Sequence, residues 1–473
     1  MRGYRLRAVL RGVLIALTVS LTMSCATPDT SNESPSPLPD TVSAAEVPSV
    51  VGMTEARWAE ATSVHAPTPI RVRTCTLPEQ TLEAFHDTLS MAAASVDSGD
   101  LLFETGSIEA PSAASVVKLF TATAALRLLG PDYRFRTTVV QGEKAGELFL
   151  VGGGDVTLTR APGNNYYVST TSLQELARQT RESMAGAVEA PYAVRPDTSR
   201  YEQYVDWSDG WRAGSDRLGY VAPISALQVD ADRDFPNTRL SPRSSDPTSR
   251  AVGWFVDELA RQGFLSVSSG IPGTATEQGR ELASVQSAPL EALLPTMLLD
   301  SDNSLAEVIA REVALADDSS NIGASIQRWS GVDQSLFLDS ALIGGSGLDS
   351  ASRLPHGAIL NLLQQIAEDP ALEVIRENLP ESGESGSLRN RFSSVSANLE
   401  GRVQAKTGTL SETRSLAGFV TANDGSEIAF SINASGPSIR ASTLDDIDRL
   451  VGAIAFCGEN LSSQAERAAT QHD

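Results

Sequence analysis

The run of residues 115–129 is apolar at almost every position and is followed by Gly130-Pro131. An apolar run of this length predicts a helix that is buried on all sides, and the Gly-Pro pair predicts where it stops. Residues three apart share one face of a helix, so Lys118 is expected beside Ser115. The amino terminus of the helix also presents unpaired backbone N–H groups that can bind a developing oxyanion. We therefore expect a core helix whose first turn carries a paired hydroxyl and amine.

Lysine is rare in this chain, which makes the position of each one informative. Of the 37 lysine and arginine residues only three are lysines, at positions 118, 144 and 406. An arginine stays charged at any accessible pH, whereas a buried lysine can lose its proton and act as a base. Lys144 lies in a turn-like segment between two glycines and is expected to be solvated. Lys118 and Lys406 each lie in a short motif, and both are predicted to take part in chemistry.

Two further motifs follow Ser115-x-x-Lys118 along the chain. Ser301-Asp302-Asn303 directly precedes a segment of helical periodicity, and Lys406-Thr407-Gly408 lies in a predicted strand. Each motif alone has a plain structural explanation, as a helix cap or as a solvated strand residue. All three in this order resemble the motif set of penicillin-binding proteins and class A β-lactamases. Together they indicate acyl transfer to a serine hydroxyl.

The chemistry of acyl transfer assigns roles to the first two motifs. Ser115 is the expected nucleophile, and it needs a base because a serine hydroxyl is too weakly acidic to attack unaided. Lys118 is the expected general base, neutral among apolar neighbours and beside the cation Lys406. Ser301 is expected to relay the proton to the departing amine. Asn303 is expected to hold Lys118 and an amide of the substrate.

The third motif is expected to bind the substrate. Lys406 would stay charged and would bind the terminal carboxylate, helped by the hydroxyls of Thr407 and Thr409. Gly408 would let the substrate lie against the strand. The N–H groups of Ser115 and Thr409 are the expected oxyanion hole, where the loss of one donor typically costs about 3 to 4 kcal/mol in the transition state.

Beyond these motifs, longer segments resemble the serine D-alanyl-D-alanine carboxypeptidase/endopeptidase family, the low-molecular-mass class C penicillin-binding proteins of peptidase family S13. The segments are residues 148–159, 220–230, 345–348, 379–392 and 405–410, and the likeness covers about residues 78–456. The resemblance implies an α/β fold of the α+β kind. Its catalytic domain is serine β-lactamase/DD-peptidase-like, with an antiparallel sheet flanked by helices, and it is interrupted by a strand-rich inserted domain.

The expected regions follow from this resemblance and from the composition along the chain. They are a signal peptide at 1–24, a flexible Ser/Pro-rich tether at 25–69, a split catalytic domain at 70–132 and 283–458, the inserted domain at 133–282 and a polar tail at 459–473. Arginines and a short apolar run before Cys25 predict export. Lipid attachment at Cys25 and ordinary cleavage beside it both stay open. In an oxidising compartment Cys75 and Cys457 could form a disulfide, and two separate buried thiols are the alternative.

The resemblance also implies a substrate and a class of inhibitor. The substrate is a peptidoglycan stem peptide ending in D-Ala-D-Ala, cleaved through an acyl-enzyme on Ser115, and β-lactams acylate the same serine. Members of the family commonly continue Ser-Gly-Leu with Ser-Arg, whereas here Asp349-Ser350 follow and arginine comes only at Arg353. Recognition of a diaminopimelate end is therefore an open question. The side chains expected to line the substrate site are Trp211, Asp216, Tyr220, Ser346 and Leu348.

Composition argues against several other classes of function. The formal charge of −22 opposes binding to nucleic acid or anionic lipid, so membrane contact is expected only through a lipid anchor at Cys25. The few histidines and cysteines show no metal-ligand spacing, and no metal or other cofactor is expected. Two rival functions remain. A β-lactamase of the same fold is opposed by the large inserted domain, and a non-catalytic envelope binding protein is opposed by the intact motifs.

Overall fold

The computed structural model describes residues 73–463, apart from 86–87, 107–108, 164, 169–170, 185, 277, 396–397 and 438. The predicted signal peptide, the tether and Cys25 lie outside the described residues. All of the described residues belong to one compact unit that begins at Arg71. The chain forms two five-stranded sheets in this unit.

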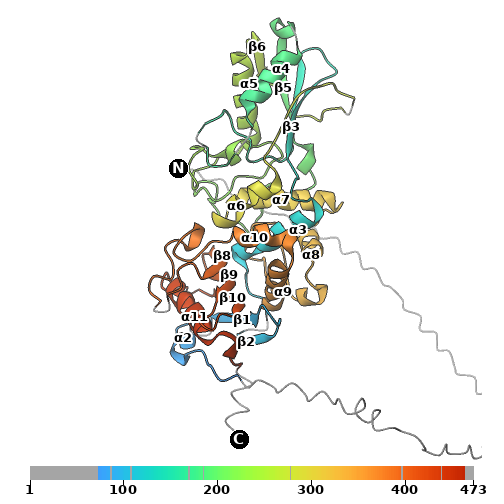
Figure 1. Cartoon of the computed structure of the whole chain (residues 1–473). Coiled ribbons are helices and arrows are strands. Elements are labelled where there is room, and N and C mark those ends of the chain that lie inside the picture. The colour runs from blue at the N-terminus through green and yellow to red at the C-terminus, as the bar shows by residue number, and fades with distance from the viewer. Residues whose placement is uncertain are drawn as a thin grey trace, which may run out of the picture. The chain divides into compact units, whose positions relative to one another are not determined.

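The first sheet is antiparallel and joins strands from both ends of the described chain. Its order is β2-β1-β10-β9-β8. The strands are β1 (Leu89–Ser95), β2 (Leu101–Thr105), β8 (Val403–Leu410), β9 (Thr413–Thr421) and β10 (Glu427–Ser435). Alternate residues of a strand face opposite sides, and the two faces enter different hydrophobic cores. Helix α11 (Thr443–Cys457) covers one face and α9 (His356–Glu368) the other (Figure 1).

The second sheet belongs to the inserted domain and is mixed. Its order is β6-β5-β4-β3-β7, with β4, β5 and β6 parallel to one another and β3 antiparallel to both of its neighbours. The strands are β3 (Arg136–Gln141), β4 (Glu147–Val151), β5 (Pro191–Asp197), β6 (Ser266–Ser269) and β7 (Glu281–Gln286). Helices α4 (Leu173–Ser183) and α5 (Pro247–Arg261) pack their apolar faces on it (Figure 1). Strand β7 crosses the predicted boundary at residue 282, so this sheet extends to Gln286.

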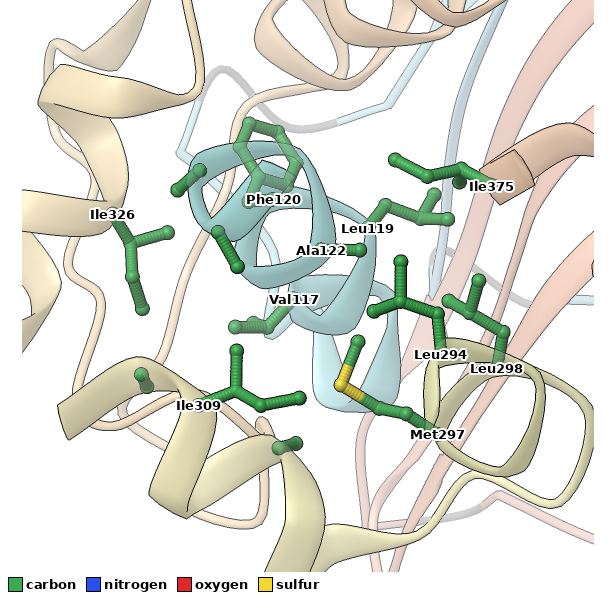
Figure 2. Packing of buried hydrophobic residues seen from close by; sticks show 14 of the residues in the cluster. Val117, Leu119, Phe120, Ala122, Leu294, Met297, Leu298, Ile309, Ile326 and Ile375 are labelled. Atoms are coloured by element: carbon green, nitrogen blue, oxygen red, sulfur yellow. The ribbon is translucent and has the colours of Figure 1, made fainter. Parts of the chain in front are cut away.

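Helix α3 (Val117–Leu128) is the buried helix expected from the sequence. Its residues from Val117 to Leu126 are all buried. Figure 2 shows its side chains packed against those of the helices that surround it. These helices are α6 (Leu290–Leu299), α7 (Asn303–Ala316), α8 (Ile322–Trp329) and α10 (Glu373–Glu377). The structure differs from the expectation at one point, because Ser115 lies in a short 3-10 turn, Ala114–Val116, that leads into the α-helix.

The two ends of the described chain are joined. A disulfide links Cys75 to Cys457 with an S–S distance of 2.07 Å, and the short helix α2 (Glu79–Glu83) follows Cys75. The prediction of a polar tail from residue 459 is wrong at its start. The side chain of Leu461 is fully buried, and the carbonyl of Asn460 accepts a 3.0 Å hydrogen bond from the N–H of Cys75. A buried apolar side chain and backbone hydrogen bonds with Cys75 thus hold the beginning of this segment against the core.

The fold is the mixed α/β type that the sequence predicted, with an antiparallel catalytic sheet flanked by helices and a strand-rich inserted domain. Across the part of the chain that the structure describes, no helix is long and apolar enough to cross a membrane.

Candidate active site

Ser115 is positioned by the sheet against which its turn packs. The carbonyl of Ser112 accepts a 2.7 Å hydrogen bond from Nδ2 of Asn433 on β10, and the carbonyl of Ala113 accepts a 3.0 Å bond from Oγ of Ser415 on β9. Ala114 has a positive φ of 45°, which is uncommon for a residue that is not glycine and marks local backbone strain. Two sheet strands and a strained backbone therefore fix the place at which Ser115 enters the site.

Lys118 lies at the centre of the site and is fully buried. Its Nζ is within hydrogen-bond distance of three oxygens, Oγ of Ser115 at 2.9 Å, Oδ1 of Asn303 at 2.7 Å and the carbonyl of Ser346 at 2.7 Å. A neutral amine has two hydrogens and one lone pair. The amide and the carbonyl can only accept, so they take the two hydrogens and leave the lone pair for the hydroxyl of Ser115. This geometry suits a base that removes the proton of that hydroxyl.

The protonation of Lys118 is set by opposing effects. Burial lowers the pKa of Lys118 from 10.5 to about 7. The negative charges of Asp302 and Glu307 raise the same pKa, and the positive charge of Arg239 lowers it. A pKa of about 7 leaves a large neutral fraction at neutral pH, as a general base requires.

The second motif lies at the start of α7. Asp302 is the N-cap of this helix, because its Oδ1 accepts a 2.8 Å bond from the N–H of Leu305. Ser301, just before it, has a positive φ of 59°, and its Oγ accepts a 2.9 Å bond from Nζ of Lys406. The cap thus fixes a strained turn that brings Ser301 and Asn303 to the two lysines.

The inserted domain binds three residues in and beside this motif, Asp300, Asp302 and Asn303. Arg239 donates two hydrogen bonds, of 3.0 and 2.7 Å, to the carbonyl of Asp300. The carbonyl of Tyr220 accepts a 3.1 Å bond from Nδ2 of Asn303. Arg233 is fully buried, forms a 2.7 Å ion pair with Asp302 and lies over the rings of Tyr166 and Tyr167. The inserted domain therefore holds the turn that carries Ser301 and Asn303.

Lys406 is also fully buried, and its electrostatic environment differs from the one expected. Nζ donates to Oγ of Ser301 and to the carbonyl of Thr407, both at 2.9 Å. Burial, with the positive charges of Lys118 and Arg239, lowers the pKa of Lys406 well below its usual value. No carboxylate among the described residues forms an ion pair with it. A constant positive charge on Lys406 therefore needs an anion beside it, which the terminal carboxylate of a substrate would supply.

A cavity of about 710 Å³ opens over these groups. Three of the predicted motif residues in its wall are Ser115, Ser301 and Asn303, and Thr407 and Thr409 line it as well. Of the five predicted lining residues only Tyr220 and Leu348 do so. Trp211 is 6% exposed and packs edge-on against Trp207, and Asp216 does not reach the wall.

Ser346 and Gly408 both make close contacts inside the protein. The side chain of Ser346 is fully buried and turned away from the cavity, and its carbonyl instead accepts from Lys118. A Cβ added to Gly408 would lie 2.0 Å from Oγ of Ser415 and 2.9 Å from Cβ of Ala114. A side chain at position 408 would therefore disturb the packing of β8 against the turn before Ser115.

The arginine of the altered Ser-Gly-Leu segment also lies away from the cavity. Arg353 donates to the carbonyl of Ala110, and Asp349 is buried, where it accepts a 2.6 Å bond from Oγ of Ser208. Basic side chains from elsewhere line the cavity, and they are Arg212, Arg239, Arg243 and Arg414.

Sequence reasoning missed three groups that touch the site. Oγ of Ser387 lies 2.7 Å from Oγ1 of Thr407, Arg239 reaches in from the inserted domain, and Glu307 holds the Ser346 segment. Only Glu307 had a signal in the sequence, as a carboxylate one helical turn after Asn303. No group of three or more acidic, histidine or cysteine side chains suited to a metal occurs among the described residues.

The fold and the two serine–lysine pairs define a serine acyl-transfer enzyme of the type that penicillin-binding proteins and serine β-lactamases represent. Within that type, the sequence matches the D-Ala-D-Ala carboxypeptidase 3 (S13) family over residues 79–239 and 233–455, and the chain belongs to this family. The serine-type D-Ala-D-Ala carboxypeptidase function that the motifs predicted is thereby confirmed.

Curated relatives and solved structures agree with this assignment. Carboxypeptidase DacB of Mycolicibacterium smegmatis is 34% identical over 380 residues, which cover 76% of this chain and 79% of the relative. A D-alanyl-D-alanine carboxypeptidase of Actinomadura sp. is 26% identical over 431 residues, with coverage of 72% and 76%. The structure of penicillin binding protein 4 from Haemophilus influenzae has a similar fold, with a TM-score of 0.65 at 20% identity, over 78% of this chain and 98% of the other.

Proposed function

We propose that the protein removes the terminal D-alanine from peptidoglycan stem peptides outside the cytoplasmic membrane, through an acyl-enzyme on Ser115. The observation that carries the proposal is the placement of Nζ of Lys118, which is held by two acceptors and faces Oγ of Ser115 at 2.9 Å. Ser301, Asn303 and Thr407 line the same cavity, where a peptide end can lie between Asn303 and the β8 strand.

The reaction begins when Lys118 takes the proton of Ser115 as Oγ attacks the carbonyl carbon of the penultimate D-alanine. The N–H groups of Ser115 and Thr409 bind the oxyanion that forms. The C–N bond then breaks, and the departing amine receives the proton from Lys118 through the hydroxyl of Ser301. Water hydrolyses the resulting ester in a second step and restores the hydroxyl of Ser115.

Substrate binding uses the charge of Lys406. The terminal carboxylate of the peptide pairs with its ammonium group and with the hydroxyls of Thr407 and Thr409. The incoming carboxylate also favours the charged form of Lys406. Asn303 holds an amide of the substrate as well as Lys118.

A β-lactam would acylate the same serine, because its amide carbonyl takes the place of the scissile one. A solved structure of penicillin binding protein 4 from Haemophilus influenzae contains a bound β-lactam, which supports this part of the proposal. Export is supported by the arginine-led apolar run before Cys25 and by the disulfide between Cys75 and Cys457, since disulfides persist in oxidising compartments. Lipid attachment at Cys25 stays a prediction.

The test is release of D-alanine from a model pentapeptide ending in D-Ala-D-Ala, together with labelling by a fluorescent penicillin. The full chain should release D-alanine and bind the label, and Ser115→Ala should do neither. Ser411→Ala, an exposed serine in the wall of the same cavity, is the matched control and should retain both activities. Labelling of Ser115→Ala would remove the nucleophile assignment, and turnover of the penicillin without D-alanine release would favour a β-lactamase.

A further inference from the structure

Helix α7 carries two polar groups one turn apart on the face that points to Lys118. Asn303 bonds Lys118 directly at 2.7 Å. Glu307 lies four residues later, is only 1% exposed, and is not needed for the reaction as described above. Burial of a carboxylate costs free energy unless the carboxylate is fully hydrogen-bonded. The hydrogen-bond partners of Glu307 therefore indicate its role.

The partners of Glu307 are concentrated in one short segment. Oε1 accepts hydrogen bonds from the N–H of Gly345 at 3.2 Å, from the N–H of Ser346 at 3.0 Å and from Oγ of Ser346 at 2.6 Å. Oε2 forms a 3.0 Å ion pair with Arg311, itself 3% exposed. One carboxylate oxygen thus fixes the N–H groups of Gly345 and Ser346 and the hydroxyl of Ser346. The carbonyl of this serine is the one that faces Lys118.

The same segment has no room for side chains at its two glycines. A Cβ on Gly345 would lie 2.4 Å from Cβ of Ala310, and a Cβ on Gly347 would lie 1.9 Å from the carbonyl of Ala114. The segment is therefore wedged between α7 and the turn that carries Ser115. A shift of the Ser346 carbonyl would therefore change both its hydrogen bond with Lys118 and the packing of the turn before Ser115.

We propose that Glu307 is a positioning residue for Lys118, because it fixes the Ser346 carbonyl that takes one hydrogen of the amine and so turns the lone pair toward Ser115. The inference rests on the proposed role of Lys118 as the base. Without Glu307, the segment that carries this carbonyl loses the three hydrogen bonds donated by Gly345 and Ser346, and the amine can rotate away from the hydroxyl. A misplacement of about 1 Å remote from the reacting atoms can cost on the order of 100-fold in rate.

The charge of Glu307 adds a second, separable effect. The charged groups that shift the pKa of Lys118 are Asp302 and Glu307 from the start of α7 and Arg239 from the inserted domain, and the amine of Lys406 on β8 lies near them. Removal of the negative charge of Glu307 lowers the pKa of Lys118 further. The neutral form of the amine then appears at lower pH, so the pH profile of acylation moves down.

The experiment compares Glu307→Gln, Glu307→Asp and Glu312→Gln in the full chain, with the rate of acylation by a fluorescent penicillin measured against pH. Glu312 is the matched control, because it is 2% exposed on the same helix and pairs with Arg200 away from the site. Glu307→Gln should acylate about 10- to 100-fold more slowly, with its midpoint at lower pH. Glu307→Asp, which keeps the charge but shortens the reach, should lose rate without the shift. Glu312→Gln should keep the rate and midpoint of the parent.

Two results would overturn the proposal. One is an equal loss of acylation in Glu307→Gln and Glu312→Gln with no change of midpoint, which indicates loss of stability alone. The other is an unchanged rate in Glu307→Asp. If neither Glu307 variant folds, Ser346→Ala removes one anchoring bond and should lower the rate several-fold at an unchanged melting temperature, and an unchanged rate there would contradict the proposal. Failure of the proposed function is distinguished by Lys118→Ala, which would then acylate as fast as the parent.

Discussion

Nζ of Lys118 and Oδ1 of Asn303 lie 2.7 Å apart, although the two residues are separated by 185 positions in the chain. The chain between them contains the whole inserted domain and α6. This bond joins the buried helix α3 to the first turn of α7, so the base is assembled only when both halves of the catalytic domain have packed together.

Acylation of Ser115 should follow the neutral fraction of Lys118. Because burial lowers the pKa of Lys118 to about 7, the rate should rise with pH through about 7 and level off above it. The measurement is the second-order rate of labelling by a fluorescent penicillin at a series of pH values around neutrality. A rate that is independent of pH across this range would show that Lys118 does not act as the base.

Arg239→Gln should move that profile to higher pH. The positive charge of Arg239 lowers the pKa of Lys118, so its removal raises this pKa and delays the appearance of the neutral amine. The matched control is Arg217→Gln, since Arg217 is exposed on the same inserted domain and does not line the cavity. A midpoint that stays in place would mean that solvent screens the charge of Arg239, and a midpoint that moves down would contradict the prediction.

Lys406→Arg should lower kcat/KM for the pentapeptide by at least about ten-fold. Arginine is longer and planar, and cannot occupy a fully buried site shaped for one ammonium group without displacing Ser301 or Thr407. Lys144→Arg is the control, because the side chain of Lys144 is 81% exposed. Normal activity of Lys406→Arg would show that only the positive charge matters at this position.

The positions of these lysines in the site could be predicted from the sequence. Rarity of lysine and the spacing of three short motifs were enough to identify Ser115, Lys118, Asn303 and Lys406, and the structure brings all four together. The buried helix was also predictable, because the apolar run and the Gly130-Pro131 pair that ends it are local features of the sequence.

The remaining features depend on contacts that a sequence does not encode locally. The Ser346 carbonyl is a backbone group, so no residue type reveals it. Trp211 could equally line a cavity or pack in a core, and only the neighbouring Trp207 decides the matter. The lowered pKa of Lys406 arises from burial and from two cations brought close by folding. The ion pair between Arg233 and Asp302 likewise joins distant parts of the chain.

Arg233→Met should destabilise the protein and slow its acylation. The variant leaves the buried carboxylate of Asp302 without its ion-pair partner, which typically costs about 3 to 5 kcal/mol. Because Asp302 caps α7 and precedes Asn303, its displacement should also weaken the hydrogen bond between Asn303 and Lys118. Chemical denaturation and penicillin labelling measure the two effects. Destabilisation with an unchanged acylation rate would show that the inserted domain does not help to hold the catalytic motif.

Gly408→Ala should lower stability by about 1 to 3 kcal/mol through overpacking, since the new Cβ would lie 2.0 Å from Oγ of Ser415. Ser415→Ala removes that oxygen, so the double variant should regain part of the loss, and the two substitutions should not be additive. Thermal unfolding and the KM for the pentapeptide separate two explanations of this glycine. If it serves substrate approach, Gly408→Ala raises KM at unchanged stability and Ser415→Ala gives no rescue. If internal packing requires it, Gly408→Ala lowers stability at an unchanged KM, and Ser415→Ala restores part of that stability.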